Sequence, residues 1–208
     1  MRISRRAFTT LIALILGITS AVAQQSGFNL VVVGDPQPQT EEQITKLESE
    51  LIPQIATIVD EYKATGYPTA ILLTGDVVWD NMAFLPRVKA DFEALGVPVY
   101  AVIGNHDHNR RHQRNQAKAE QNYVDAFGSR NQAFILGETL FVTLDNIDYT
   151  SKNGYGLEVD LEQLIWLSEV MEEMVATSIV AIVKIRFIVV VFFCVNAFIV
   201  ITLYPILR

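Results

Sequence analysis

Three apolar runs in the first half of this chain each end in a glycine that is followed at once by polar residues. The runs, with the residues that close them, are Leu30–Val33 with Gly34-Asp35, Ala70–Thr74 with Gly75-Asp76, and Val97–Ile103 with Gly104-Asn105-His106-Asp107. Short runs rich in Val, Ile and Leu are typical of strands buried in a parallel sheet. Because the carboxyl ends of parallel strands meet at one edge of the sheet, we expect the polar side chains to gather there.

Helical patterns separate these strands. Thr40 and Gln43 form a capping-box signature at the start of a helix, and Pro53 should kink that helix or begin a second segment. Further predicted elements are helices over 82–95, over 113–126 and from Asp160, and a hairpin of Gln132–Leu136 with Thr139–Leu144. This alternation predicts an α/β fold with a mostly parallel sheet that is flanked by helices and covered on both faces, with a local antiparallel pair.

The N-terminus has the three parts of a secretory signal peptide. It begins with basic residues that include Arg5-Arg6, continues with the apolar segment Leu11–Ile18, and ends in the small-residue pattern Ala21-Val22-Ala23. Residues 1–23 therefore predict an exported protein, periplasmic or extracellular. The paired arginines also resemble a twin-arginine signal, so the general and the twin-arginine routes both stay open.

Charge and cysteine usage exclude some classes of function. The signal peptide holds three arginines and no acid, so its removal takes the formal net charge from −7 to −10. Such an acidic chain offers no platform for nucleic acid, whose binding depends on neutralising phosphates. The single cysteine, Cys194, excludes an intrachain disulfide, so the fold must be stabilised by packing.

The composition changes after Met174. Residues 175–208 contain no Asp, Glu, Gly or His and are mainly Ile, Val and Phe. As a helix rising about 1.5 Å per residue, Phe187–Leu207 could cross a hydrocarbon layer of about 30 Å, although its β-branched content also suits a buried strand. We therefore divide the chain into 1–23, a domain over 24–174, and a tail over 175–208 that is either a transmembrane segment or an out-of-frame extension.

The strand-end motifs resemble those of the calcineurin-like metallophosphoesterases. The family pattern of Asp-x-His, Gly-Asp and Gly-Asn-His-Asp corresponds to Asp35-Pro36-Gln37, Gly75-Asp76 and Gly104-Asn105-His106-Asp107. The similarity covers roughly 28–174 and is strongest at the last motif. It implies a metallophosphoesterase-like fold and two divalent metal ions, drawn from Mn, Fe, Zn and Mg.

The resemblance also implies roles for individual residues. Asp76 would bridge the two ions, with Asp35 on the first and Asn105 on the second. His106 would protonate the leaving group or stabilise the phosphoryl oxygens, and Asp107 would orient His106 by a hydrogen bond. Two such ions can activate a water and clamp a phosphate for in-line displacement.

The chain departs from the family pattern in two ways. Gln37 stands where the family has a histidine, and its amide oxygen is a weaker metal ligand. The family also takes histidines from later strands, whereas the histidines of this chain are His106, His108 and His112. We therefore expect the C-terminal half to be incomplete and the two-metal centre to lack ligands.

Other polar residues near the motifs have a functional and a structural interpretation. We expect a solvated basic loop, rather than the entrance for a phosphate, from His108, Arg110, Arg111 and His112. Asp145-Asn146 is expected to form a turn rather than a wall of the site. Trp79 and Asp80 could edge the pocket or form a surface turn, and Trp166 is expected in the core.

Together these features predict an exported metal-dependent phosphoesterase whose activity is impaired by the missing histidines. Its substrate would be a small phosphomonoester or phosphodiester, or a phosphorylated substrate, attacked by a metal-activated water. The alternative is a non-catalytic module that binds a metal or a phosphate and is tethered to a membrane through 187–207. Membrane fractionation of the tail distinguishes the two.

Overall fold

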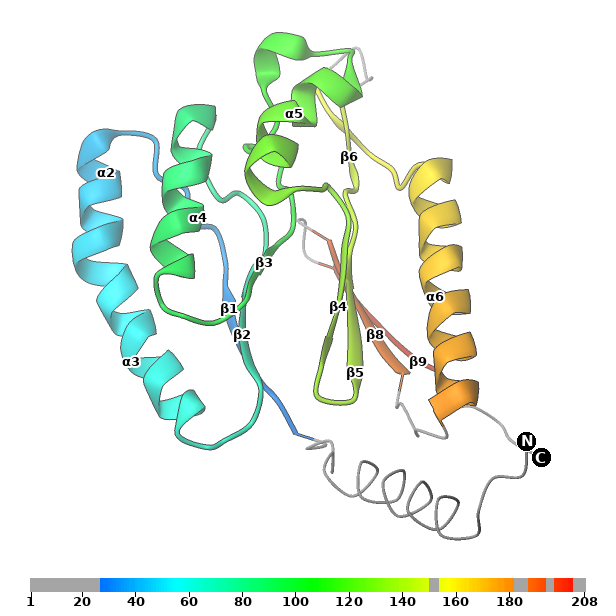
Figure 1. The fold of residues 1–208 in the computed structure, drawn as a ribbon. Helices are drawn as coiled ribbons and strands as arrows, with labels where there is room; N and C mark the ends of the chain where they lie inside the picture. Colours follow the sequence, from blue (N-terminus) through cyan, green and yellow to red (C-terminus); the bar gives the residue numbers. More distant parts are fainter. Residues whose placement is uncertain (1–26, 150–153, 182–186, 194–196, 204–208) are drawn as a thin grey trace, which may run out of the picture.

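The computed structural model describes residues 27–149, 154–181, 187–193 and 197–203, with side chains as far as residue 174. The predicted signal peptide, 1–23, lies outside the described residues. Within them the structure has four layers, in which helices, two sheets and a last helix follow one another (Figure 1).

The first sheet carries the three strand ends singled out above. Its strands are parallel and lie in the order β1 (Asn29–Val33), β2 (Thr69–Leu73) and β3 (Val99–Ala101). All five residues of β2 are buried, because neighbours cover this strand on both sides and both faces. The central strand therefore fixes the edge at which the polar motifs meet.

Helices cover the outer face of this sheet (Figure 1). In chain order they are α2 (Glu41–Lys46), a π-helical turn η1 (Leu47–Leu51), α3 (Ile52–Lys63), a 3₁₀ turn η2 (Met82–Phe84), α4 (Leu85–Glu93), a 3₁₀ turn η3 (Arg110–His112) and α5 (Gln116–Phe127). The predicted capping box is present, with the Thr40 side chain accepting from Gln43 and the Gln43 side chain accepting from Thr40. Pro53 lies in the first turn of α3, so it begins a second segment, as one of the two expectations had it.

The second sheet begins with the predicted hairpin. β4 (Gln132–Leu136) and β5 (Thr139–Thr143) pair antiparallel, and β8 (Phe187–Phe193) and β9 (Ala197–Leu203) extend the sheet in the order β4-β5-β8-β9. A short pair, β6 (Ile147–Asp148) with β7 (Gly156–Leu157), follows β5. The last helix, α6 (Leu161–Ala181), packs on the outer face of β5, where Trp166 is half-buried against Leu140 and Val142.

The two sheets face each other and form an apolar layer between them. Leu72 and Val102 of the first sheet pack against Phe134 and Phe141 of the second, and the rings of Tyr100 and Phe134 stack with centroids 3.5 Å apart. The α/β class and the parallel sheet flanked by helices are confirmed. The sheet is covered on both faces, as expected: helices lie on its outer face and the second sheet covers its inner face.

The apolar tail enters the second sheet. β8 pairs parallel with β5, and β9 pairs antiparallel with β8. Of the two conformations that its sequence allowed, the structure therefore has the strand. In the part of the chain that the structure describes, every helix is too short or too polar to cross a bilayer.

Candidate metal and active site

The ends of β1, β2 and β3 meet around Asp76. The backbone N–H of Gln37 donates to the Asp76 carbonyl oxygen at 3.2 Å, and the backbone N–H of His106 donates to Asp76 Oδ1 at 3.0 Å. A β-carbon on Gly104 would collide with the backbone nitrogen and the carboxylate of Asp76. The turn that carries Asn105 therefore lies directly against Asp76, as the sequence predicted from strand topology.

The predicted ligands have unusual backbone conformations. Asp35, Gln37 and Asp76 have φ angles of 46°, 45° and 46°. Residues with a β-carbon visit this left-handed region at a cost of roughly 1–2 kcal/mol each. Because such strain collects at functional sites, its occurrence at these three residues supports a role for this sheet edge.

The electrostatics of Asp76 show that negative charge gathers here. Burial raises the pKa of Asp76, and the hydrogen bond from His106 opposes that shift. The carboxylates of Asp35 and Asp80 raise the pKa further. Asp35 and Asp76 are thus close enough to repel each other, an arrangement that a bound cation would relieve.

The ring of His106 is held by Asp80, and the expectation that Asp107 orients it is wrong. His106 Nδ1 lies 3.0 Å from Asp80 Oδ1, and Asp80 Oδ2 accepts from Arg110 Nη1 at 3.1 Å. The indole of Trp79 stacks on the imidazole with ring centroids 3.8 Å apart. Trp79 and Asp80 therefore edge the site, which was one of their two interpretations.

Asp107 points into the interior of the protein. It is fully buried, and its two carboxylate oxygens accept from the backbone N–H groups of Val78, at 2.9 Å, and Gly104, at 2.8 Å. Its side chain cannot reach outward to His106 because it already joins the β2 and β3 loops. Asp107 thus positions the turn.

His108 and Asp145 are not the solvated loop and simple turn that the sequence suggested. Both side chains are buried, and His108 Nε2 lies 3.2 Å from Asp145 Oδ2. Arg111 and His112 are exposed, in keeping with the solvated-loop expectation. Sequence alone missed the difference because neighbouring residues of a turn point in different directions.

Two contributors gave no signal in the sequence that singled them out. The Tyr149 hydroxyl donates to the Asn105 carbonyl oxygen at 2.8 Å, and the Gln116 side-chain oxygen accepts from the Tyr149 backbone N–H at 2.8 Å. These contacts attach the Asn105 turn to α5 and to the segment after β5. The position of Asp80 in the loop that follows Asp76 was a sequence signal that it lies near the site.

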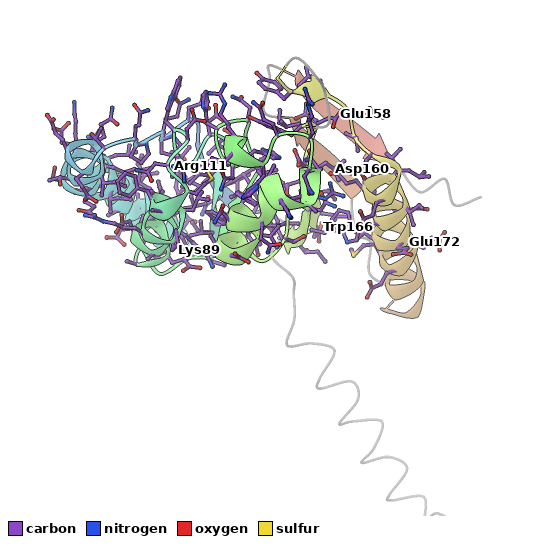
Figure 2. All side chains as sticks on the ribbon, turned by 90° about the horizontal axis from the view of Figure 1, so that it is seen from above. Lys89, Arg111, Glu158, Asp160, Trp166 and Glu172 are labelled. Atoms are coloured by element: carbon purple, nitrogen blue, oxygen red, sulfur yellow. The ribbon has the colours of Figure 1, made fainter. Side chains whose placement is uncertain are left out.

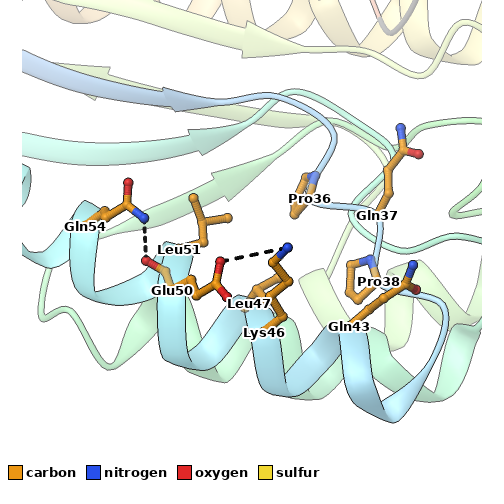
Figure 3. Close-up of a pocket in the computed structure, with 9 residues that line it drawn as sticks. All are labelled: Pro36, Gln37, Pro38, Gln43, Lys46, Leu47, Glu50, Leu51 and Gln54. Atoms are coloured by element: carbon orange, nitrogen blue, oxygen red, sulfur yellow. Dashed lines mark hydrogen bonds and ion pairs between the residues drawn. The ribbon is translucent and has the colours of Figure 1, made fainter.

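A shallow groove of about 330 Å³ begins beside Gln37 and runs along α2, η1 and α3 (Figure 3). Lys46 and Glu50, an ion pair at 3.9 Å, line it together with Gln43. The groove is open and has a mixed polar and apolar lining, and it gives an extended molecule room next to the predicted ligands.

The donor set at the sheet edge fits divalent ions in part. Carboxylate oxygens from Asp35 and Asp76 and amide oxygens from Gln37 and Asn105 are hard ligands that suit Mg²⁺ and Mn²⁺. Imidazole ligands favour Zn²⁺ and other transition metals. The sequence has no histidine after residue 112, so the later strands supply no imidazole to this site.

Comparison with protein families agrees with this geometry. The model of the calcineurin-like phosphoesterases matches residues 28–196, past the predicted boundary at 174 and through β8. The chain belongs to the calcineurin-like phosphoesterase family, and membership implies metal-dependent hydrolysis of phosphoesters. A search among curated proteins finds no match to this chain.

Proposed function

We propose that the carboxyl edge of the first sheet is the active site of an exported metal-dependent phosphoesterase. The observation that carries this proposal is the convergence of Gln37, Asp76 and His106, joined by the two hydrogen bonds to Asp76. In this proposal Asp35, Gln37, Asp76 and Asn105 hold two divalent ions. Such ions, when bound, lower the pKa of a water and neutralise the phosphate.

His106 acts on the leaving group. Its Nδ1 is occupied by Asp80, so Nε2 is the nitrogen that can give a proton to a departing oxygen or donate to a phosphoryl oxygen. The contact with Asp80 fixes the orientation of the ring, and the stacked indole of Trp79 fixes its plane. Arg110, exposed and paired with Asp80, lies at the rim, where a phosphate would approach.

The exposed rim of the site supports a small phosphomonoester, a phosphodiester or a phosphorylated side chain as substrate. Asp35 is exposed and Asn105 is half-buried, so both side chains are accessible to an incoming phosphate. The acidic balance of the chain disfavours nucleic acid as a partner. The signal-like N-terminus supports export, and the pairing of β8 with β5 favours the enzyme over the membrane-tethered module.

The missing imidazole ligands lower the expected rate. The Gln37 amide oxygen is a weaker donor than an imidazole, so this residue would hold a divalent ion less tightly than the family's histidine. We expect slow hydrolysis that requires added Mn²⁺.

An assay of the full chain with bis(4-nitrophenyl) phosphate and 4-nitrophenyl phosphate tests this function. Hydrolysis should stop with a chelator and fall about 100-fold or more in His106→Ala, while the exposed His112→Ala serves as the matched control and keeps the wild-type rate. Equal rates in His106→Ala and wild type would overturn the assignment.

A further inference from the structure

Three buried side chains lie behind the sheet edge and are not used in the proposed reaction. They are His108 after β3, Glu120 on α5 and Asp145 after β5, and one ligand atom from each lies within 4.8 Å of the others. Their exposed fractions are 0%, 8% and 1%. None of the three belongs to the strand-end motifs that carry the family resemblance.

The His108 ring brings its Nε2 close to a carboxylate oxygen of Asp145. Its Nδ1 lies 2.8 Å from the Gly104 carbonyl oxygen, which can only accept, so Nδ1 carries a hydrogen. Nε2 faces Asp145 Oδ2 at 3.2 Å, which is again an acceptor. Gln116 Nε2 lies 3.4 Å from His108 Nε2, but its closer contacts are with Asp145 Oδ2, at 3.1 Å, and with the Ile147 carbonyl oxygen, at 2.8 Å. A proton on His108 Nε2, or a metal ion between this nitrogen and Asp145, would compensate the approach of the two acceptors.

The geometry and the charge favour a metal ion over a proton. With bonds of about 2.0–2.2 Å and tetrahedral angles, two ligand atoms on one zinc ion are roughly 3.3–3.6 Å apart, which is close to the 3.2 Å from His108 Nε2 to Asp145 Oδ2. A metal-bound histidine also commonly donates its other N–H to a backbone carbonyl, as His108 does to Gly104. A proton would neutralise one carboxylate, whereas Glu120 adds a second.

The neighbours of Glu120 compensate the negative charge of its carboxylate only in part. Its Oε2 is buried and receives no hydrogen bond from the described residues. The cation beside it is Arg130, whose Nη1 is 3.6 Å away and also bonds Asp160 at 2.8 Å, while Nη2 bonds Glu162 at 3.0 Å. One guanidinium is thus shared among three carboxylates, so the cluster keeps an excess of negative charge.

An acidic pocket leads to this cluster. It has a volume of about 220 Å³ and is lined by Gln116, Ile147, Asp148, Glu158, Asp160 and Gln163. Gln116 and Gln163 both hydrogen-bond to Asp145, so the floor of the pocket touches the buried group. Glu158 and Asp160 lie where the chain enters α6 (Figure 2). Asp148 and Glu158 add negative charge that favours the approach of a cation, while Asp160 is paired with Arg130.

We propose that His108, Glu120 and Asp145 form a buried binding site for one divalent transition-metal ion, of the chemistry of Zn²⁺, separate from the ions at the sheet edge. The ion joins the loop after β3 to α5 and to the segment after β5. It thereby stabilises the turn that carries Asn105 and His106.

The test uses the full chain with the substitution Asp76→Asn, which removes the sheet-edge site. The protein is stripped with a chelator, loaded with Zn²⁺ and dialysed, and its bound zinc is then measured. We expect one Zn²⁺ per chain to remain in Asp76→Asn. Adding Glu120→Gln should weaken its binding about tenfold or more. Glu162→Gln is the matched control, since it also removes a carboxylate from Arg130 but leaves the cluster intact, and it should retain the ion. An Asp76→Asn chain that holds no zinc would overturn the proposal.

A measurement on the unsubstituted cluster covers the case in which Glu120→Gln does not fold. In the Asp76→Asn chain labelled with ¹⁵N-histidine, Zn²⁺ should shift the Nε2 resonance of His108 and leave exposed His112 unchanged. A His108 resonance that follows pH alone and ignores Zn²⁺ would show that a proton occupies the site. Because the sheet-edge site is absent from this chain, the outcome is independent of the proposed hydrolysis.

Discussion

Single residues at the end of β3 show how far sequence can predict a site. The turn Gly104 to Asp107 was expected at the sheet edge and lies there, because strand ends fix backbone position. Its side chains nevertheless point apart: His106 lies at the half-buried rim against Trp79, while Asp107 and His108 are fully buried. Residue type predicts the chemistry of a side chain. The direction in which that side chain points from a turn depends on contacts with loops that are distant in sequence.

Gly104 is the residue whose size matters most at the site. Gly104→Ala would place a β-carbon against the backbone nitrogen and the carboxylate of Asp76. Since backbone atoms cannot move aside cheaply, we expect a loss of about 3 kcal/mol or more in the free energy of unfolding, together with loss of Mn²⁺ binding. Chemical denaturation and calorimetric titration measure these two effects.

The matched control is Gly128→Ala. Gly128 has φ +87° and nothing within 4 Å of an added β-carbon, so strain alone acts there. It should cost roughly 1–2 kcal/mol and leave metal binding intact. Equal effects of the two substitutions would show that the close approach of Gly104 to Asp76 is not a constraint.

At the scale of elements, local signals were the most reliable. The capping box at Thr40 and the hairpin of β4 and β5 were predicted and are present, because neighbouring residues determine each. The Val97–Ile103 run was predicted as one strand, yet only Val99–Ala101 is paired as β3. The division into two facing sheets could not be predicted, since it depends on contacts such as Tyr100 with Phe134.

The helix α5 carries a pH-dependent contribution to stability. Burial raises the pKa of Glu120 from 4.5 to about 7, with Arg130 opposing the shift. Between these values the folded state holds a proton that the unfolded state releases, so the stabilising effect is complete below pH 4.5 and is lost as pH rises to about 7. At about 1.4 kcal/mol per pKa unit, the loss amounts to about 3 kcal/mol.

Urea denaturation of chelated protein from pH 4.5 to pH 7.5 measures this effect. In Glu120→Gln the free energy of unfolding should fall less steeply over that window than in wild type, because glutamine does not titrate. The exposed Glu162→Gln should follow the wild-type curve. Parallel curves for Glu120→Gln and wild type would show that Glu120 titrates alike in both states.

At the scale of the whole molecule, the layers hold the sheet edge in place. The helices on one side and the second sheet on the other leave β2 no freedom to shift, and its end carries Asp76. The account therefore rests on the sheet edge being a cation site built by three strands.

Calorimetric titration of Mn²⁺ into the full chain is the most direct test of that claim. Asp76→Asn should reduce Mn²⁺ affinity more than about 100-fold, because a residue that binds the metal directly contributes more to the affinity than a residue that only supports a ligand. Asp60→Asn, on the exposed face of α3, is the control and should leave the affinity unchanged. If Asp76→Asn binds Mn²⁺ as tightly as wild type, the three strand ends do not form a metal site.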